Sequence, residues 1–141
     1  MIMLQVIPFI YNDRDDLFAN TYIVIDEENK CVVIDPSSTN DGIMNYILKN
    51  NLEIQAIILT HGHFDHIQGI ANILSKKVVP VYIYEDEKEF LIDTRLNCSY
   101  FIGKPFKLDV ALNGIVDGEI INCLNEQLKI IHTPYHTSGS I

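Results

Sequence analysis

The chain has 141 residues, of which 19 are acidic and 10 basic, and its formal net charge at pH 7 is -9. A hydrophobic content of 48% with 21% charged residues is typical of a folded chain and excludes general disorder, and the length suits one domain over residues 1–141. The acidic balance argues against a nucleic-acid partner. No signal peptide is visible, and no apolar run approaches the roughly 20 residues of a membrane span, so we expect a cytoplasmic protein without a membrane partner.

Apolar runs rich in β-branched residues alternate with helical patterns and predict a mixed α/β fold. The expected strands are Leu4–Phe9, Thr21–Ile25, Cys31–Ile34, Ile54–Leu59 and Val79–Tyr84. The expected helices are 41–50, 66–77 and 85–92. Residues 93–118 lack a clear period and predict a long loop, and Glu119–Leu124 with Gln127–Ile131 predict a hairpin. Helices are expected to cover one face of a mixed sheet.

Histidine and aspartate residues gather directly after the buried strand 54–59. His61 and His63 are two residues apart in an extended loop and therefore can hold one ion, whereas Asp65 and His66 face a neighbouring position. The alternative is that Asp65 only caps a helix that begins near His66. Three histidines and an aspartate within six residues favour a metal site, because imidazole is the commonest protein ligand of divalent metals.

The three cysteines, Cys31, Cys98 and Cys123, are odd in number and widely spaced, and they form no CxxC pair. This pattern predicts free or buried thiols in a reducing compartment rather than a disulfide or a metal site.

The run His61-x-His63-x-Asp65-His66 resembles the HxHxDH signature of the metallo-β-lactamase superfamily, and the preceding Leu59-Thr60 resembles its usual context. The segment His132–Ser140 is similar to the next motif of that family, which supplies one further metal-binding histidine. Val33-Ile34-Asp35-Pro36 resembles the end of the family's early hairpin. The runs 96–99 and 103–106 are similar to a loop of small glyoxalase II-like hydrolases. The resemblance covers essentially the whole chain.

Carried over residue by residue, the resemblance assigns His61, His63 and His136 to a first metal ion. It assigns Asp65 and His66 to a second, with Asp65 also orienting the nucleophile. The implied cofactor is zinc, one or two ions, and the same ligands suit iron or manganese.

The resemblance also implies an αββα sandwich. Family members are longer and contribute a bridging aspartate and a last histidine after the second motif, whereas this sequence ends at Ile141. The expectation is that the chain supplies the N-terminal portion, that the C-terminal half is missing, and that the chain can self-associate through the uncovered sheet face.

Several residues near these ligands are expected to have structural or supporting roles, or none. His132 falls outside the ligand pattern and is expected to have a structural role at a strand end. Asp35 is either a turn former or a residue that holds a ligand histidine by a hydrogen bond. Tyr135 stands where many relatives have glycine, and neither Cys98 nor Cys123 matches a ligand position.

The function implied by the resemblance is metal-dependent hydrolysis, in which a hydroxide on the metal attacks a carbonyl carbon. The favoured small-molecule substrate is a thioester such as an acyl-glutathione. A lactonase of the same superfamily is an alternative, and the acidic charge disfavours a nuclease. An alternative from a different functional class is a metal-binding fragment with impaired catalysis, or an interaction module.

Overall fold

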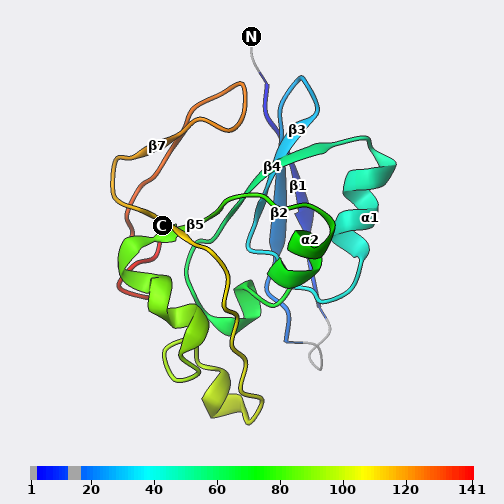
Figure 1. Cartoon of the computed structure of the whole chain (residues 1–141). Helices are drawn as coiled ribbons and strands as arrows, with labels where there is room; N and C mark the ends of the chain where they lie inside the picture. Colours follow the sequence, from blue (N-terminus) through cyan, green and yellow to red (C-terminus); the bar gives the residue numbers. More distant parts are fainter. Residues whose placement is uncertain (1–2, 13–16) are drawn as a thin grey trace.

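The computed structural model describes residues 3–12 and 17–141, and its centre is a six-stranded mixed sheet in the order β1-β2-β3-β4-β5-β6 (Figure 1). The strands are β1 Gln5–Phe9, β2 Thr21–Ile25, β3 Lys30–Ile34, β4 Glu53–Ile58, β5 Val81–Tyr84 and β6 Asn113–Ile115. β1, β2 and β3 pair antiparallel, and β3 to β6 pair in parallel. The mixed α/β class expected from the sequence is confirmed.

Two α-helices and three 3-10 helices connect or follow these strands. They are α1 Gly42–Lys49, α2 Ile70–Lys76, η1 Phe64–His66, η2 Glu85–Ile92 and η3 Ser99–Ile102. A second, two-stranded sheet pairs β7 Ile120–Ile121 with β8 Leu128–Lys129 in antiparallel fashion. None of these helices, in the part of the chain that is described, has the length and apolar character needed to cross a bilayer.

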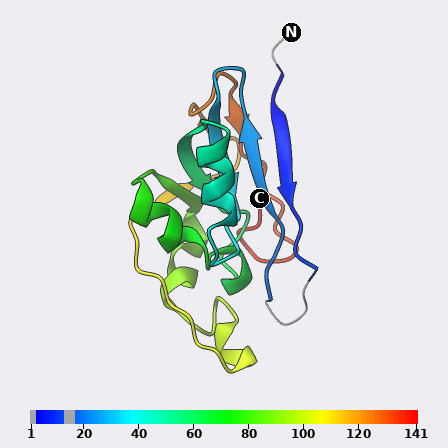
Figure 2. The same cartoon turned by 90° about the vertical axis from the view of Figure 1, so that its right-hand side faces the viewer.

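The two α-helices, α1 and α2, lie on the same side of the sheet, as Figure 2 shows. Ile43 and Ile47 of α1 and Ile70 and Ile73 of α2 are buried in the same apolar cluster as alternate residues of the strands. On the opposite face, a smaller cluster joins the other alternate strand residues to Ile121 and Ile130. Each central strand is therefore buried on both faces, which explains its nearly continuous apolar sequence.

The predicted first residue of the second helix, His66, was wrong. A 3-10 turn occupies Phe64–His66, and α2 begins only at Ile70. The residue before α2, Gly69, donates its N–H to the Pro36 carbonyl at 2.8 Å. Asp65 therefore does not cap a helix at His66. The helix expected at 85–92 is present, but with 3-10 geometry.

The long loop expected at 93–118 contains two short elements that its sequence did not indicate. These are η3 and the strand β6, which pairs with β5 although two of its three residues, Asn113 and Gly114, have low strand propensity. The hairpin expected after residue 118 is present with much shorter strands, β7 and β8, than the sequence indicated.

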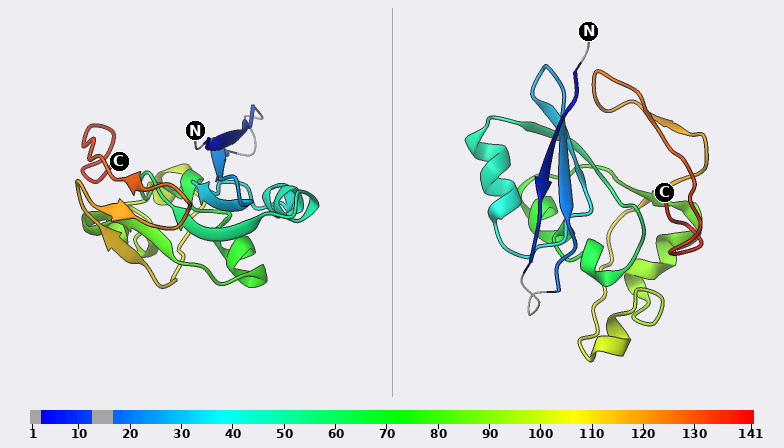
Figure 3. Two further views of the ribbon diagram at one scale, coloured as in Figure 1. Left: turned by 90° about the horizontal axis from the view of Figure 1, so that it is seen from above. Right: turned by 180° about the vertical axis from the view of Figure 1, so that it is seen from behind.

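The parallel strands place the functional segments at one edge of the sheet, because parallel strands all end at the same edge. Asp35 follows β3, the histidine motif begins three residues after β4 ends, and η2 follows β5. The C-terminal loop lies beside η2 (Figure 3), and the Ile141 N–H donates to the Thr60 carbonyl at 3.0 Å. Both histidine segments therefore meet at this edge.

Candidate metal centre

Three histidines from two distant segments meet at the carboxyl edge of the sheet. One ring nitrogen from each of His61, His63 and His136 lies within 4.8 Å of the others. His63 Nδ1 and His136 Nε2 are 3.2 Å apart, and the ring centroids of His61 and His136 are separated by 4.7 Å. The structure therefore brings together the three residues that the resemblance assigned to the first metal.

The surroundings of His61 determine which of its nitrogens faces this cluster. The Thr60 hydroxyl donates to Asp35 Oδ2 at 2.6 Å, so it accepts the proton on His61 Nδ1 at 3.0 Å. This arrangement leaves the lone pair on His61 Nε2, a buried atom that has no hydrogen-bond partner among the described residues. Buried polar atoms in proteins normally have a partner, and an unpaired imidazole lone pair beside two further imidazoles fits a divalent cation.

Burial keeps two of these imidazoles neutral. It lowers the pKa of His61 to about 3, with a smaller contribution from the neighbouring histidines. The pKa of His63 is also lowered, by burial and then by His136. Because only a neutral imidazole binds a metal, both side chains are in the ligating form at neutral pH.

Asp65 and His66 lie beside this cluster, with 3.8 Å between Asp65 Oδ2 and His66 Nε2. The His66 ring is 4.1 Å, centroid to centroid, from that of His61. Burial lowers the pKa of His66, but the hydrogen bond and charge of Asp35 and the charge of Asp65 outweigh it and raise the pKa overall. No third histidine, cysteine, aspartate or glutamate among the described residues joins Asp65 and His66 in a second cluster.

Asp35 combines the two roles that the sequence left open. Its backbone has a positive φ of 52°, which marks a turn. Its Oδ2 accepts from His66 Nδ1 at 2.8 Å, and its Oδ1 accepts from the Thr60 N–H at 2.7 Å. A single carboxylate therefore orients His66 directly and His61 through Thr60.

The second histidine of the C-terminal loop has a different environment. His132 stacks on Tyr84 with 4.3 Å between ring centroids and 12° between planes, and its Nε2 bonds to the Ser138 carbonyl at 2.7 Å. It does not join the histidine cluster. Tyr135, next to His136, is 94% exposed.

The sequence pattern gave no role to two residues at this edge. Thr60 links Asp35 to His61, and Glu87 in η2 is fully buried beneath the first histidine loop. The sequence around Glu87 gives no signal of this burial, because Glu87 stands in the acidic run Glu85-Asp86-Glu87. A charged residue is seldom fully buried in a core unless it is paired.

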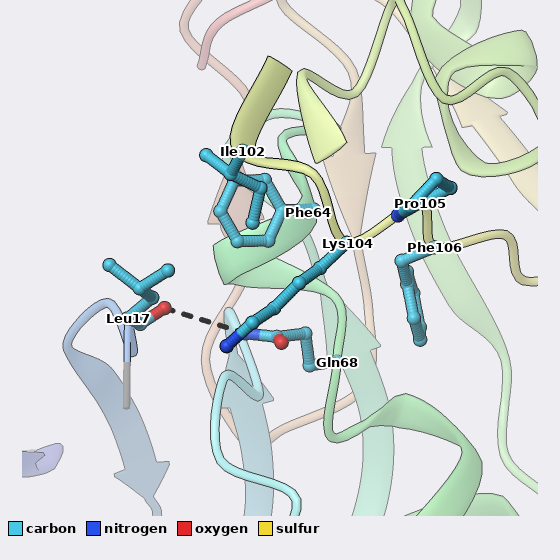
Figure 4. A pocket seen from close by; sticks show the side chains of 7 residues that line it. All are labelled: Leu17, Phe64, Gln68, Ile102, Lys104, Pro105 and Phe106. Atoms are coloured by element: carbon cyan, nitrogen blue, oxygen red, sulfur yellow. Dashed lines mark hydrogen bonds between the residues drawn. The ribbon is translucent and has the colours of Figure 1, made fainter. Parts of the chain in front are cut away.

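A cavity of about 260 Å³ adjoins the metal motif. Figure 4 shows Lys104 extending across it toward Gln68 and Leu17, with Phe64 and Phe106 as aromatic walls. Its remaining lining residues are Ile102 and Pro105.

The loop that forms one wall of the cavity is fixed to the metal motif by Asn97, which is fully buried. The Asn97 carbonyl accepts from the Phe64 N–H at 2.9 Å, and its Nδ2 donates to the Phe106 carbonyl at 2.9 Å. Ser99 closes the same loop by accepting from the Phe106 N–H at 2.9 Å.

Comparison with known proteins identifies the family. Residues 14–141 match the model of the metallo-beta-lactamase superfamily, and the chain belongs to this superfamily. It is 36% identical over 129 residues to the probable metallo-hydrolase YqgX of Bacillus subtilis (strain 168), covering 87% of this chain and 58% of that protein. It is 30% identical over 125 residues to hydroxyacylglutathione hydrolase 1 of Vibrio vulnificus (strain YJ016), covering 89% of this chain and 43% of that protein. The chain thus spans about half the length of these curated relatives.

Solved structures show the same fold. The BLEG-1 B3 metallo-beta-lactamase superimposes with a TM-score of 0.83 at 26% identity, over 98% of this chain and 65% of that one. The structure of TTHA1623 in a di-iron-bound form gives a TM-score of 0.68 at 23% identity, over 86% of this chain and 59% of that one. The expected superfamily and fold class are thereby confirmed.

Proposed function

We propose that this chain carries the three-histidine metal site of a hydrolase that cleaves thioesters of the acyl-glutathione type. The observation that carries the proposal is the buried, unpaired His61 Nε2 facing the ring nitrogens of His63 and His136. These three residues would hold the first ion, and Asp65 and His66 would contribute to a second. Zinc is the preferred metal, and iron and manganese suit the same ligands.

A divalent ion held here would supply Lewis acidity and lower the pKa of water toward about 7. The chain's own groups have separate tasks. The Asp65 carboxylate would orient the attacking water. Asp35 and Thr60 hold the tautomers of His66 and His61, so that neither ring rotates during the reaction. The site uses no serine or cysteine nucleophile.

Two observations support the substrate class. Relatives at about 30% identity are hydroxyacylglutathione hydrolases. The cavity beside Phe64 has apolar walls and one cationic residue, Lys104, which suits a substrate with an apolar stem and a carboxylate, as in glutathione thioesters.

The test is hydrolysis of S-lactoylglutathione by the purified 141-residue chain, measured with and without added zinc. We expect zinc-dependent thioester cleavage that disappears in His61→Ala. Turnover that survives both chelation and His61→Ala would contradict the proposal. Cleavage of a lactone with no cleavage of thioesters would replace the substrate class while retaining the metal site.

A second candidate function is metal binding without turnover. It is favoured by the second position, where Asp65 and His66 lack a third partner among the described residues. Tight zinc binding by a folded chain that cleaves neither thioester nor lactone would select this alternative.

A further inference from the structure

Glu87 is a buried carboxylate that the proposed function does not use. Its side chain is fully buried, and its Oε1 has no hydrogen-bond partner among the described residues. Burying an unpaired carboxylate is costly, so a glutamate at a core position of η2 requires a specific contact to retain it.

That contact is with the first histidine loop. The Gly62 N–H, between His61 and His63, donates to Glu87 Oε2 at 3.2 Å. A Cβ on Gly62 would lie 2.5 Å from Phe90 Cβ, so the loop backbone is pressed directly against η2. The two ligands on either side of Gly62 are therefore held by η2 through one hydrogen bond and one close packing contact.

The same glutamate also touches the second histidine loop. A Cβ on Gly139, three residues after His136, would lie 2.7 Å from Glu87 Cγ and 3.0 Å from Tyr84 Cδ1. The stem of Glu87 thus supports the C-terminal loop while its head binds the first loop.

We infer that Glu87 is a positioning residue that sets the separation between the His61–His63 loop and the His136 loop, and so controls the affinity and coordination geometry of the three-histidine site. The inference rests on the proposed metal site. In this role Glu87 acts through the backbone of the two histidine loops and contacts neither the metal nor the substrate. The role requires an oxygen that accepts from the Gly62 N–H and a side chain of this length. Glutamine has both, so Glu87→Gln should keep the function.

The test is titration of the metal-free chain with Co²⁺, followed by visible absorption, which reports ligand geometry independently of turnover. In Glu87→Leu, the Gly62 N–H loses its acceptor, and we expect the affinity for Co²⁺ to fall by at least about tenfold with a changed ligand-field spectrum. Glu87→Gln keeps the acceptor and is expected to restore the spectrum and to bind Co²⁺ within about threefold of the unmodified chain. Glu89→Leu, an exposed position in the same η2, is the matched control and should change neither.

Gly139→Ala tests the same idea from the other loop, because its methyl group would displace Glu87 Cγ. It should also weaken Co²⁺ binding, and it keeps the inference testable if Glu87→Leu does not fold. Folded Glu87→Leu with an unchanged spectrum and affinity would overturn the inference. Equal losses in Glu87→Gln and Glu87→Leu would also overturn it, since the negative charge would then be the property required. If the unmodified chain binds no Co²⁺, the proposed function itself fails, which is a distinct result.

Discussion

Asp35 Oδ2 accepts a hydrogen bond from His66 Nδ1 at 2.8 Å, and this contact connects the end of β3 to the metal motif that follows β4. Asp35 also accepts from the backbone and the hydroxyl of Thr60, so three donors converge on one carboxylate that is 4% exposed. A buried carboxylate with several donors is well compensated, and each donor would be left unpaired without it.

We therefore expect Asp35→Ala to destabilise the metal-free protein by about 3 kcal/mol, measured by urea unfolding. The pKa of His66 should fall, because Asp35 raises it whereas burial, which lowers it, remains. NMR titration of the imidazole would report this change. Asp41→Ala removes an exposed carboxylate that pairs with Lys76, and as a control it should cost less than about 1 kcal/mol. An unchanged pKa of His66 in Asp35→Ala would contradict the role of this contact.

Metal stoichiometry is the second prediction. A catalytic zinc site needs three protein ligands and a position for water, and His61, His63 and His136 supply the three. Asp65 and His66 alone make a weak site. Elemental analysis after dialysis should find about one ion per chain, and none in His63→Ala. Two tightly held ions per chain would show that further ligands come from elsewhere.

The two histidines of the C-terminal loop should behave differently. His136→Ala should abolish zinc-dependent hydrolysis, because it removes one of the three clustered imidazoles. His132→Ala loses the stacking on Tyr84 and the bond to Ser138 but no clustered nitrogen, so activity should stay within about threefold of the unmodified chain. Initial rates on S-lactoylglutathione compare the two. If His136→Ala and His132→Ala both fold and lose the same fraction of activity, then His136 has been wrongly assigned as the metal ligand of this loop.

The histidine motif could be predicted from sequence because its signal is local. His61 and His63 follow a continuous apolar strand at ligand spacing, and the structure places their rings together. The partnership of His136 with them spans 73 positions of the chain and followed from family resemblance, since no local pattern indicates so distant a contact.

Contacts that depend on the tertiary fold were not predictable. Glu87 lies in an acidic run that is typical of an exposed segment, and only the approach of Gly62 and Gly139 explains its burial. β6 was missed because Asn113 and Gly114 are poor strand formers, and pairing with β5 decides their conformation. The start of α2 was misplaced because the bond from Gly69 to Pro36, on another segment, interrupts the helical pattern.

Lys104 provides a prediction about substrate recognition. In Lys104→Met, we expect KM for S-lactoylglutathione to rise about threefold to fivefold with little change in kcat, because an exposed charge contact is worth up to about 1 kcal/mol and is made in both ground and transition states. A thioester without carboxylates should show no such rise. Lys107→Met, in the same loop but outside the cavity lining, is the control. Equal effects of both substitutions would indicate a general charge effect and no specific contact.

We propose, finally, that the 141-residue chain self-associates through the apolar groove on the sheet face opposite the helices. This groove has a volume of about 290 Å³ and is lined mainly by isoleucines, among them Ile34, Ile58, Ile130 and Ile131. Ile131 is 64% exposed, and burying it would remove apolar surface from water. Sedimentation velocity at tens of micromolar, about the range in which exposed apolar faces associate, should detect a dimer or larger species that Ile131→Lys reduces. Leu48→Lys, at a position that is 65% exposed on α1, is the matched control and should leave the association unchanged. A compact monomer of the unmodified chain at that concentration would refute the proposal.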